Sequence, residues 1–466
     1  MRPTTPLEKA LAVNLDGRRY GTFAEIGAGQ EVVRWFFQAG GASGTIAKSI
    51  SAYDMTVSDA IYGECARYVA RERLESMLSY EQNLNLERLT KKRGDSTAFF
   101  TFADTVSARN FQGTNECHGW IGVKFQSHPK DESSQVILHV RMLDSENALQ
   151  QEALGVVGVN LLYGCCMLYH EPEVLIESLL DGLSTQRIEI DMIEFSGIEF
   201  RHVDNRIMSL RLVQLGLSGV AMIGADGRVL QPSEVLRHRS VLVERGRFRP
   251  VTHVNIDMLN SALQQFDKEK PTADEGVLPL LEITMSNLAE KDGDVDLQDF
   301  ISRAEVLATT GHTVMISDYF EYYRLAAYLS RYTSGRIGIA LGVPTLKELF
   351  NESHYTKLEG GILESFGRLF KNELKLYVYP ARDFVTGELT TVANMPVDPA
   401  LRQLYDYLVA RGCIVQLERY DESVLHIFSP DVLAKIQSGA TGWECMVPDG
   451  VADVIKQRRL FGYAAT

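Results

Sequence analysis

The 466-residue sequence has few cysteines, and no two of them are spaced as in a zinc site. The six cysteines have neither the density of a disulfide framework nor a CxxC pair, so we expect reduced, mostly buried thiols. Long apolar runs are also missing, because glycines and Asn160 interrupt the most hydrophobic stretch, residues 153–169. The sequence therefore predicts no membrane partner and no transmembrane helix, and we expect a cytoplasmic protein.

An excess of positive charge is absent as well. The chain has 47 Lys and Arg residues against 61 Asp and Glu residues, a formal net charge of −14. Because binding to a phosphate backbone requires a basic surface, this balance predicts no nucleic-acid partner. A local basic pocket for a small anion is compatible with it.

Several catalytic motifs are missing. GxSxG, HExxH and the kinase set do not occur, so serine hydrolysis and zinc proteolysis have no support. His118 follows Cys117, but His128 and His170 are not spaced from it as zinc ligands are. Residues 292–296 imitate a calcium loop, but Leu297 and Arg303 stand where glycine and glutamate are required, so helix capping is expected there.

The chain does contain a regular alternation of apolar strands and amphipathic helices. Strands are predicted at 98–102, 136–142, 188–195, 220–223, 280–285, 313–316, 337–341 and 376–379. Helices are predicted between many of them, including 147–162, 205–215, 297–308 and 322–332. This pattern predicts an α/β fold of largely parallel sheets with helical crossovers, either Rossmann-like units or a TIM-like barrel.

The first part of the chain differs from this pattern. Asp16-Gly17 predicts a β-hairpin, and helices are expected at 31–38, 45–53 and along 57–89. A charged, turn-rich stretch at 266–276 predicts a second boundary. We therefore expect a helical N-terminal segment at 1–94, a central α/β domain at 95–270 and a C-terminal α/β domain at 277–466.

The C-terminal segment 428–463 has an ordered pattern of its own. Ser429-Pro430 opens a short helix, Gly439 ends it, and Val447-Pro448 leads into a second helix and a final Leu460-Phe461-Gly462-Tyr463. This segment resembles the C-terminal signature of nicotinamide and nicotinate mononucleotide adenylyltransferases. The resemblance implies a nucleotidyltransferase-like domain in a bacterial protein. Leu433 stands where that family has a phosphate-binding arginine.

Residues 21–30 follow the outline of the GTFxPxHxGH motif of the same family. The two histidines that stabilise phosphate charge in that motif are Gly27 and Gln30 here. The resemblance therefore implies that the usual chemistry is lost. If the strand is part of a hairpin instead, the match has no bearing on function.

Polar residues follow several predicted strands, where ligands gather in parallel sheets. Asp144 and Asp318 are the candidates for binding a magnesium ion, and Asp318 is also a catalytic candidate. Each of the two also suits the N-cap of the helix that follows.

A glycine-rich turn at 40–44 leads into the helix expected at 45–53. Backbone amides near Gly41 and Gly44, with Lys48 and Ser49 one turn further on, would suit a phosphate. Residues 27–29 would extend this anion-binding surface. A tight connection between two helices explains the same glycines.

Residues 244–257 form the most polar stretch in the middle of the chain. If it is a strand, Arg245, Arg247 and Arg249 alternate on one face, and His253, Asn255 and Asp257 also alternate. Arg247 and Arg249 are therefore candidates for binding a phosphate or carboxylate, although a solvated edge strand also collects charges. His202 and His253 are candidates for proton transfer.

Two functions are compatible with these features. The first is binding of a nucleotide or another phosphorylated small molecule, with or without magnesium and catalysis. The second is a structural role, in which α/β domains that have lost catalysis form a symmetric homo-oligomer. The aromatic stretch 319–323 suits an interface of that kind.

Overall fold

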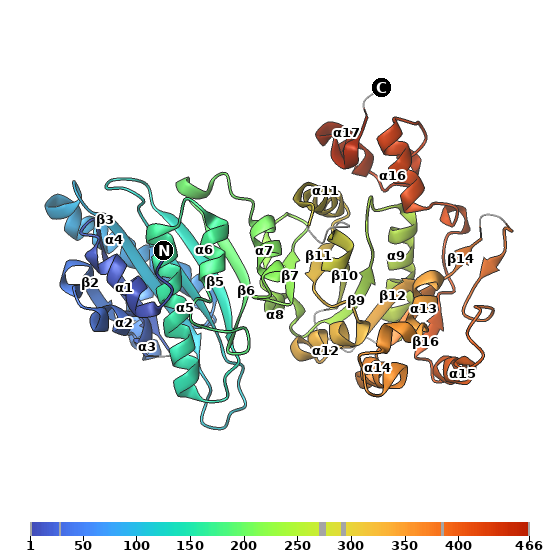
Figure 1. The fold of residues 1–466 in the computed structure, drawn as a ribbon, viewed down its shortest axis with the longest axis horizontal. Helices are drawn as coiled ribbons and strands as arrows, with labels where there is room; N and C mark the ends of the chain where they lie inside the picture. The colour runs from blue at the N-terminus through green and yellow to red at the C-terminus, as the bar shows by residue number, and fades with distance from the viewer. Residues whose placement is uncertain (1, 28, 270–275, 290–294, 384–385, 465–466) are drawn as a thin grey trace. The chain divides into compact units, whose positions relative to one another are not determined.

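The computed structural model describes residues 2–27, 29–269, 276–289, 295–383 and 386–464. The chain forms two compact units, Met1–Ala221 and Met222–Thr466 (Figure 1). The structure is α/β, as expected, but both sheets are mixed, so the prediction of largely parallel sheets is wrong. None of the described helices combines the length and apolar composition needed to cross a bilayer.

The first unit is built on a six-stranded sheet of order β2-β1-β3-β4-β5-β6. Strand β1 pairs in parallel with β2 and β3, whereas β3 to β6 pair antiparallel. The elements of this unit are α1 (Pro6–Leu15), β1 (Arg19–Ile26), α2 (Glu31–Ala39), β2 (Ile46–Ile50), α3 (Met55–Tyr62), α4 (Arg71–Arg93), β3 (Ala98–Ser107), β4 (His118–Phe125), β5 (Ser134–Met142), α5 (Asn147–Met167), α6 (Pro172–Ser178), β6 (Ile188–Ser196) and α7 (Asn205–Gln214).

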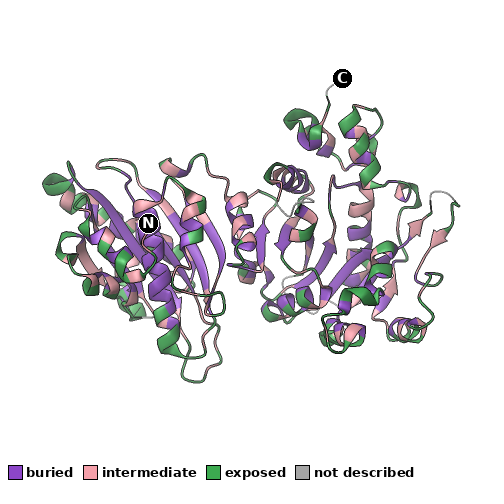
Figure 2. Ribbon diagram, in the orientation of Figure 1, coloured by how far each residue is buried: buried purple, intermediate pink, exposed green. Residues whose placement is uncertain are grey.

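Helices cover both faces of this sheet. Alternate strand residues such as Phe102 and Val123 enter a core shared with α2 and α5, while α4 packs on the opposite face. Helix α5 is buried along most of its length (Figure 2). Gly158 allows it to approach α2 closely, because a Cβ atom there would lie 2.3 Å from a methyl of Val32.

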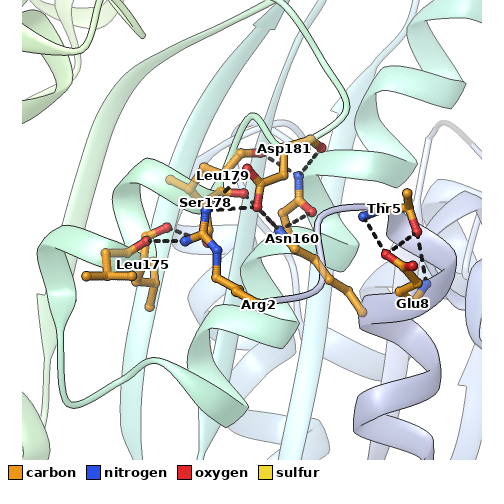
Figure 3. A network of polar contacts seen from close by, with 10 residues as sticks. Arg2, Thr5, Glu8, Asn160, Leu175, Ser178, Leu179 and Asp181 are labelled. Atoms are coloured by element: carbon orange, nitrogen blue, oxygen red, sulfur yellow. Dashed lines mark hydrogen bonds and ion pairs between the residues drawn. The ribbon is translucent and has the colours of Figure 1, made fainter.

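A buried polar network fixes α1 to α5 and the segment after α6. The ammonium of Lys9, which is fully buried, donates to Asn160 Oδ1 at 2.9 Å, to the Ser178 carbonyl at 3.1 Å and to Asp181 Oδ2 at 2.7 Å. Arg2 adds a more exposed ion pair to Asp181. Figure 3 shows Asn160, Ser178 and Asp181 converging at this point.

Three expectations for the N-terminal part are wrong. Asp16-Gly17 joins α1 to the parallel strand β1 and does not form a hairpin. The helix expected at 45–53 is strand β2, and the long helix is divided into α3 and α4 by residues 63–70. Because β1 and β2 share a sheet with β3, the first unit also differs from the predicted segments 1–94 and 95–270.

The second unit has an eight-stranded sheet of order β16-β13-β12-β9-β10-β11-β7-β8. Its elements are β7 (Val220–Ile223), which spans the boundary, β8 (Val229–Leu230), α8 (Pro232–Leu236), β9 (Ser240–Arg245), α9 (His253–Lys268), β10 (Val277–Thr284), α10 (Met285–Leu288), α11 (Leu297–Ala308), β11 (Thr313–Ser317), α12 (Tyr322–Tyr332), β12 (Ile337–Gly342), α13 (Val343–Leu349), α14 (Gly361–Leu369), β13 (Lys375–Tyr379), β14 (Ala381–Arg382), β15 (Leu389–Thr390), α15 (Arg402–Ala410), β16 (Ile414–Gln416), α16 (Ser429–Ser438) and α17 (Val451–Arg458). Strands β14 and β15 form a separate antiparallel pair.

Six neighbouring strands of this sheet, from β16 to β11, are parallel. The chain adds β9, β10 and β11 in one direction and then crosses to add β12, β13 and β16 on the other side of β9. The sheet is open, because β16 and β8 are its edges, so the barrel alternative is wrong. The direction of strand addition reverses between β9 and β12, where ligands bind in open parallel sheets.

The C-terminal segment has the local structure that its sequence predicts. Helix α16 begins at Ser429 with a proline in its first turn, and Gly439 ends it in the left-handed conformation at φ 70°. Helix α17 follows, and residues 460–462 form a closing 3₁₀ turn. The boundary expected at 266–276 lies partly outside the described residues, as do Ala28 of the 27–29 turn and residues 292–294 of the calcium-like stretch.

Candidate functional site

A cavity of about 440 Å³ opens at the carboxyl ends of the central strands of the second unit. Its lining comes from the segments that follow β9, β10 and β11, and from α13 and the turn after it. These elements meet where strand order reverses (Figure 1). The cavity therefore lies at the position that the sheet topology favours for a ligand.

One wall of the cavity is held by an ion pair between neighbouring strands. Arg245, at the end of β9, donates from Nε and Nη2 to the two carboxylate oxygens of Glu282 at 2.8 and 2.9 Å. Ser317 Oγ donates to the same carboxylate at 2.5 Å. Glu282 is fully buried. Burial alone lowers the pKa of Arg245, but the charge and hydrogen bonds of Glu282 outweigh it and raise that pKa, so the guanidinium stays protonated.

The same arginine orders the segment after β11. It donates to the carbonyls of Tyr319 and Phe320 at 2.8 and 2.6 Å, and its guanidinium lies 4.2 Å from the ring centroid of Tyr322. Burial raises the pKa of Tyr322 to about 12, which keeps the phenol neutral. Arg245 therefore donates four hydrogen bonds to protein groups, so this residue shapes the cavity but has little capacity left for a ligand.

Arg247 lies two residues further along and differs from Arg245. Its side chain is exposed, lines the cavity, and makes no hydrogen bond or ion pair with any residue that the structure describes. Its carbonyl and that of Asn287 both accept from Arg303 Nη1, at 3.0 and 2.9 Å. Arg303 thus ties together the two segments that follow β9 and β10.

The opposite wall contains a histidine. His354 Nε2 lies 3.2 Å from Glu348 Oε2, and its ring packs against Phe320 at 6.0 Å between centroids. Thr345, Leu349 and Tyr355 complete this side. The cavity therefore combines an unpaired cation, aromatic faces, hydroxyl groups and one imidazole that can carry a proton.

No family model matches this chain, and no curated protein sequence matches it either. Solved structures that resemble part of it include the competence/damage inducible protein CihA from Agrobacterium tumefaciens, at 15% identity and a TM-score of 0.26, covering 35% of this chain and 96% of that one. A CinA superfamily protein from Enterobacter cloacae has 13% identity, a TM-score of 0.24, and coverage of 35% and 94%. The Plasmodium falciparum nicotinic acid mononucleotide adenylyltransferase complexed with APC has 10% identity and a TM-score of 0.30, covering 49% of this chain and 99% of that one. Likeness at this level assigns no function to the chain.

A second, larger cavity of about 610 Å³ lies along α12 and α14. Arg324 and Arg331, two helical turns apart on α12, face it together with Arg368 and Lys371. Arg324 and Arg368 also lie near the rings of Tyr319 and Tyr323. This groove is a local basic surface in an acidic protein.

The glycine-rich turn does not have the structure expected for it. Gly41 and Gly44 belong to a short 3₁₀ turn that leads into strand β2, so no helix begins there. Lys48 forms an ion pair with the buried carboxylate of Glu81. Ser49 lies next to it on β2. This geometry does not support a phosphate site at the turn.

The helix start after residues 27–29 is also occupied. The carboxylate of Glu25 accepts hydrogen bonds from the amides of Val32 and Val33, at 2.8 and 3.2 Å, at the first turn of α2. A carboxylate of the chain itself therefore occupies this helix start, where an anionic ligand was expected.

The arginine and histidine stretch at 244–257 is not one strand. Strand β9 ends at Arg245 and α9 begins at His253, so the expected alternation of His253, Asn255 and Asp257 on one strand face is wrong. Arg249 pairs with Asp299 at 2.6 Å, which gives it a structural partner. Of the two arginines proposed for anion binding, only Arg247 lines the cavity.

The remaining candidates lie apart from the cavity lining. His202 is exposed in the turn before α7, and His253 begins α9. Asp144 accepts from Arg187 Nε at 2.8 Å. Asp318 is exposed after β11. Neither aspartate is an N-cap, since Glu146 and Glu321 occupy those positions.

The described part of the chain contains no group of three or more His, Cys, Asp or Glu side chains arranged to hold a metal ion. Binding of magnesium through Asp144 or Asp318 therefore stays a prediction. Sequence reasoning missed Glu282 and His354, whereas Ser317 was among the polar residues expected at the strand ends. One signal was available for the first of them: Glu282 is the single charged residue in the apolar strand β10.

Proposed function

We propose that the second unit binds a phosphorylated small molecule, in the first instance a nucleotide, in the cavity at the carboxyl ends of β9 to β12. The observation that carries this proposal is the unpaired guanidinium of Arg247 in a cavity at the reversal of strand order. A guanidinium is suited to phosphate, because its planar donors can form two parallel charge-assisted hydrogen bonds.

The other cavity groups suit the rest of a nucleotide. Phe320 and Tyr322 offer aromatic faces for a base, and Ser286, Asn287 and Thr345 offer donors and acceptors for a sugar or a phosphate oxygen. The volume of about 440 Å³ is within the range of small-molecule sites. The strand order from β11 to β16 is also that of dinucleotide-binding sheets, which supports the same ligand class.

If the site is catalytic, we assign proton transfer to His354, the imidazole that lines this cavity. Its hydrogen bond to Glu348 orients the ring. His202 and His253, the earlier candidates, do not line the cavity. A nucleotidyltransferase-like activity remains a proposal that this ligand class allows.

The test is a binding measurement on the full chain and the Arg247→Gln variant. Isothermal titration with AMP, ATP and nicotinate mononucleotide should give saturable binding to the unaltered protein. We expect the substitution to weaken it roughly 10- to 100-fold, the equivalent of a lost charge-assisted hydrogen bond of about 1.5–3 kcal/mol. Arg411→Gln is the matched control, because Arg411 is exposed at the end of α15 and does not line the cavity.

Two results would contradict the proposal. The first is absence of binding of any of the three nucleotides at millimolar concentration. The second is equal weakening by Arg247→Gln and Arg411→Gln, because a general loss of positive charge would then explain the effect.

A second candidate function, assembly into a symmetric homo-oligomer, is favoured by one observation in the first unit. Strand β2 is an edge of the sheet, and Tyr53, Met55 and Val57 next to it are exposed at 75%, 61% and 49%. Unpaired edges with neighbouring apolar side chains suit pairing with a second copy. Light scattering at micromolar concentration should give a multimer that Met55→Glu with Val57→Glu dissociates; a strict monomer would contradict this candidate.

A further inference from the structure

Three polar side chains form a buried hydrogen-bonded chain in the first unit. Asp191 Oδ1 on β6 lies 2.6 Å from His139 Nδ1 on β5, and His139 Nε2 lies 3.0 Å from His118 Nδ1 on β4. Asp191 and His139 are each about 1% exposed, whereas His118 is only partly buried. The chain therefore runs from a buried carboxylate to an imidazole that solvent can reach.

The sheet aligns these residues by strand alternation and by one irregularity. His118 and Trp120 point to the face of β4 that α4 covers, because Ile121 and Val123 enter the core on the other face. On the neighbouring strand β6, Met192 pairs with His139 of β5 and Ile190 pairs with Val140. Asp191, which lies between these two, is therefore an extra residue in β6. Such a bulge redirects a side chain, and here it brings the Asp191 carboxylate to His139.

The position of protons along the chain follows from donor and acceptor rules. An ionised Asp191 can only accept, so His139 Nδ1 carries a proton and donates it. If His139 is neutral, its Nε2 is an acceptor, and His118 Nδ1 must donate to it. The remaining nitrogen, His118 Nε2, then has a lone pair, and it makes no hydrogen bond with any described residue.

Burial, more than the charges around it, keeps His118 unprotonated. Burial is the main cause that lowers the pKa of His118 to about 4; His139, Arg67 and Arg141 lower it further, and Asp191 opposes them. His118 is consequently neutral at pH 7. Its lone pair stays available down to mildly acidic pH, which a freely exposed histidine does not achieve.

The location also suits a ligand. His118 begins β4 and pairs across the sheet with Ser107, the last residue of β3, on one side and with Arg141 on the other. This is the edge at which the parallel strands β1 and β3 end. Burying a carboxylate and an imidazole costs several kcal/mol unless they are paired, and a purely apolar face would avoid that cost.

We propose that the first unit contains a proton-acceptor site in which His118 Nε2 receives a hydrogen bond, and in a reaction a proton, from a hydroxyl group of a small-molecule ligand. In that step the O–H bond breaks, an N–H bond forms at Nε2, and the ligand oxygen keeps the electron pair. His139 and Asp191 are positioning residues: they fix the tautomer and stabilise the imidazolium that forms. The proposal is independent of the cavity in the second unit.

The test uses diethyl pyrocarbonate, which acylates the lone pair of a neutral imidazole nitrogen, on the folded full-length protein. Mass spectrometry of peptides measures the rate at His118, with the exposed His128 as an internal reference. We expect the His118 rate to be constant between about pH 8 and pH 5, whereas the rate of free imidazole measured alongside falls below about pH 6.5. Asp191→Asn should slow the His118 reaction about fivefold or more, because the negative charge that stabilises the acylimidazolium formed during acylation is lost.

Trp120→Phe is the matched control. Trp120 packs against the His139 ring at 4.9 Å between centroids but is outside the hydrogen-bonded chain, so its replacement should leave the rate within about twofold. Circular dichroism confirms that each variant is folded. A long-range proton–nitrogen spectrum of the unaltered protein reports the tautomer directly, without any variant.

Two outcomes would overturn the proposal. If His118 is unreactive in the folded protein at pH 7 but reacts after denaturation, or its spectrum shows a proton on Nε2, then the lone pair is not presented to a ligand. If Asp191→Asn leaves both the rate and its pH dependence unchanged, His139 and Asp191 do not position His118.

Discussion

Buried charged residues in the first unit fall into two kinds, those with a complete set of partners and those without. Lys9 has three acceptors around its ammonium. Asp104 belongs to the second kind, because its Oδ2 has no hydrogen-bond partner among the described residues. It is a cross-strand neighbour of Glu25, which accepts from two amides of α2, and both carboxyl groups are about 1% exposed. Two neighbouring carboxyl groups that are both buried resist ionisation, because burial and the charge of the neighbour each disfavour the ionised form.

The carboxylate pair predicts a pH dependence of stability. Burial raises the pKa of Glu25 to about 7, and burial together with the Glu25 charge raises the pKa of Asp104 well above its usual range. The folded protein thus keeps protons that the unfolded chain releases above about pH 4. The free energy of unfolding should therefore fall as pH rises from about 4 through 7, with this contribution fully present only below about pH 4.

The Asp104→Asn variant tests this prediction. It removes one of the two charges. It also keeps an oxygen that can accept the hydrogen bond that the Ile26 amide donates to Asp104 Oδ1 at 3.0 Å. We expect urea unfolding at pH 8 to show a gain of about 1–2 kcal/mol and a flatter pH profile. Glu132→Gln, at an exposed position, is the control and should change neither; a loss of stability in Asp104→Asn at pH 8 would contradict the argument.

Replacement of Lys9 should lower the stability of the protein, whereas replacement of Asp104 should raise it. Lys9→Met should destabilise the protein by about 3 kcal/mol in urea unfolding, because Asn160 and the Ser178 carbonyl are left without their donor and Asp181 without its buried partner. Arg2→Met, which removes the partly exposed ion pair to the same Asp181, should cost no more than about 1 kcal/mol. Equal effects of the two substitutions would show that the buried contacts of Lys9 contribute no more to the free energy of unfolding than the partly exposed ion pair of Arg2.

At the scale of elements, residues such as glycine determine where several helices end. Two glycines, one at a helix end and one inside a helix, test this interpretation. Gly439 ends α16 at φ 70°, a conformation that favours glycine, so Gly439→Ala should cost about 1 kcal/mol. Gly367 is inside α14 with open space at its Cβ position, so Gly367→Ala should stabilise by about 0.5–1 kcal/mol. Thermal unfolding of the two variants should shift in opposite directions; a shift in the same direction would contradict the assignment.

Element type was predictable where the hydrophobic pattern was long and regular. Helix α5 and strands β3, β5, β6 and β11 to β13 all contain the ranges expected from the sequence, and β10 ends one residue before its expected range does. Strand β2, IAKSI, was expected to be helical because the glycine-rich turn before it was interpreted as the start of a helix. Its pairing with β1 makes it a strand instead.

At the scale of the molecule, the two compact units predict partly independent folding. A fragment of residues 1–219 retains every strand of the first sheet and ends before β7. We expect it to unfold cooperatively in urea, with α/β circular dichroism. A fragment without a cooperative transition would show that the first unit needs the rest of the chain.

The sequence by itself determined the α/β class, about half of the described strands, the ends of several helices and the ordered C-terminal segment. These features depend on local periodicity and on turn chemistry, which act within a few residues. It also identified Arg247, through an unusual local density of charge.

Only the tertiary structure decided which polar groups meet. Strand pairing brings together Arg245 and Glu282, 37 positions apart, and His118, His139 and Asp191, which span three strands. Packing of helices against the sheets also pairs Lys48 with Glu81 on α4 and Arg249 with Asp299 on α11, which turns two expected ligand groups into structural ones. The physical reason is that register and strand order set these distances, and neither is encoded in any single stretch of the chain.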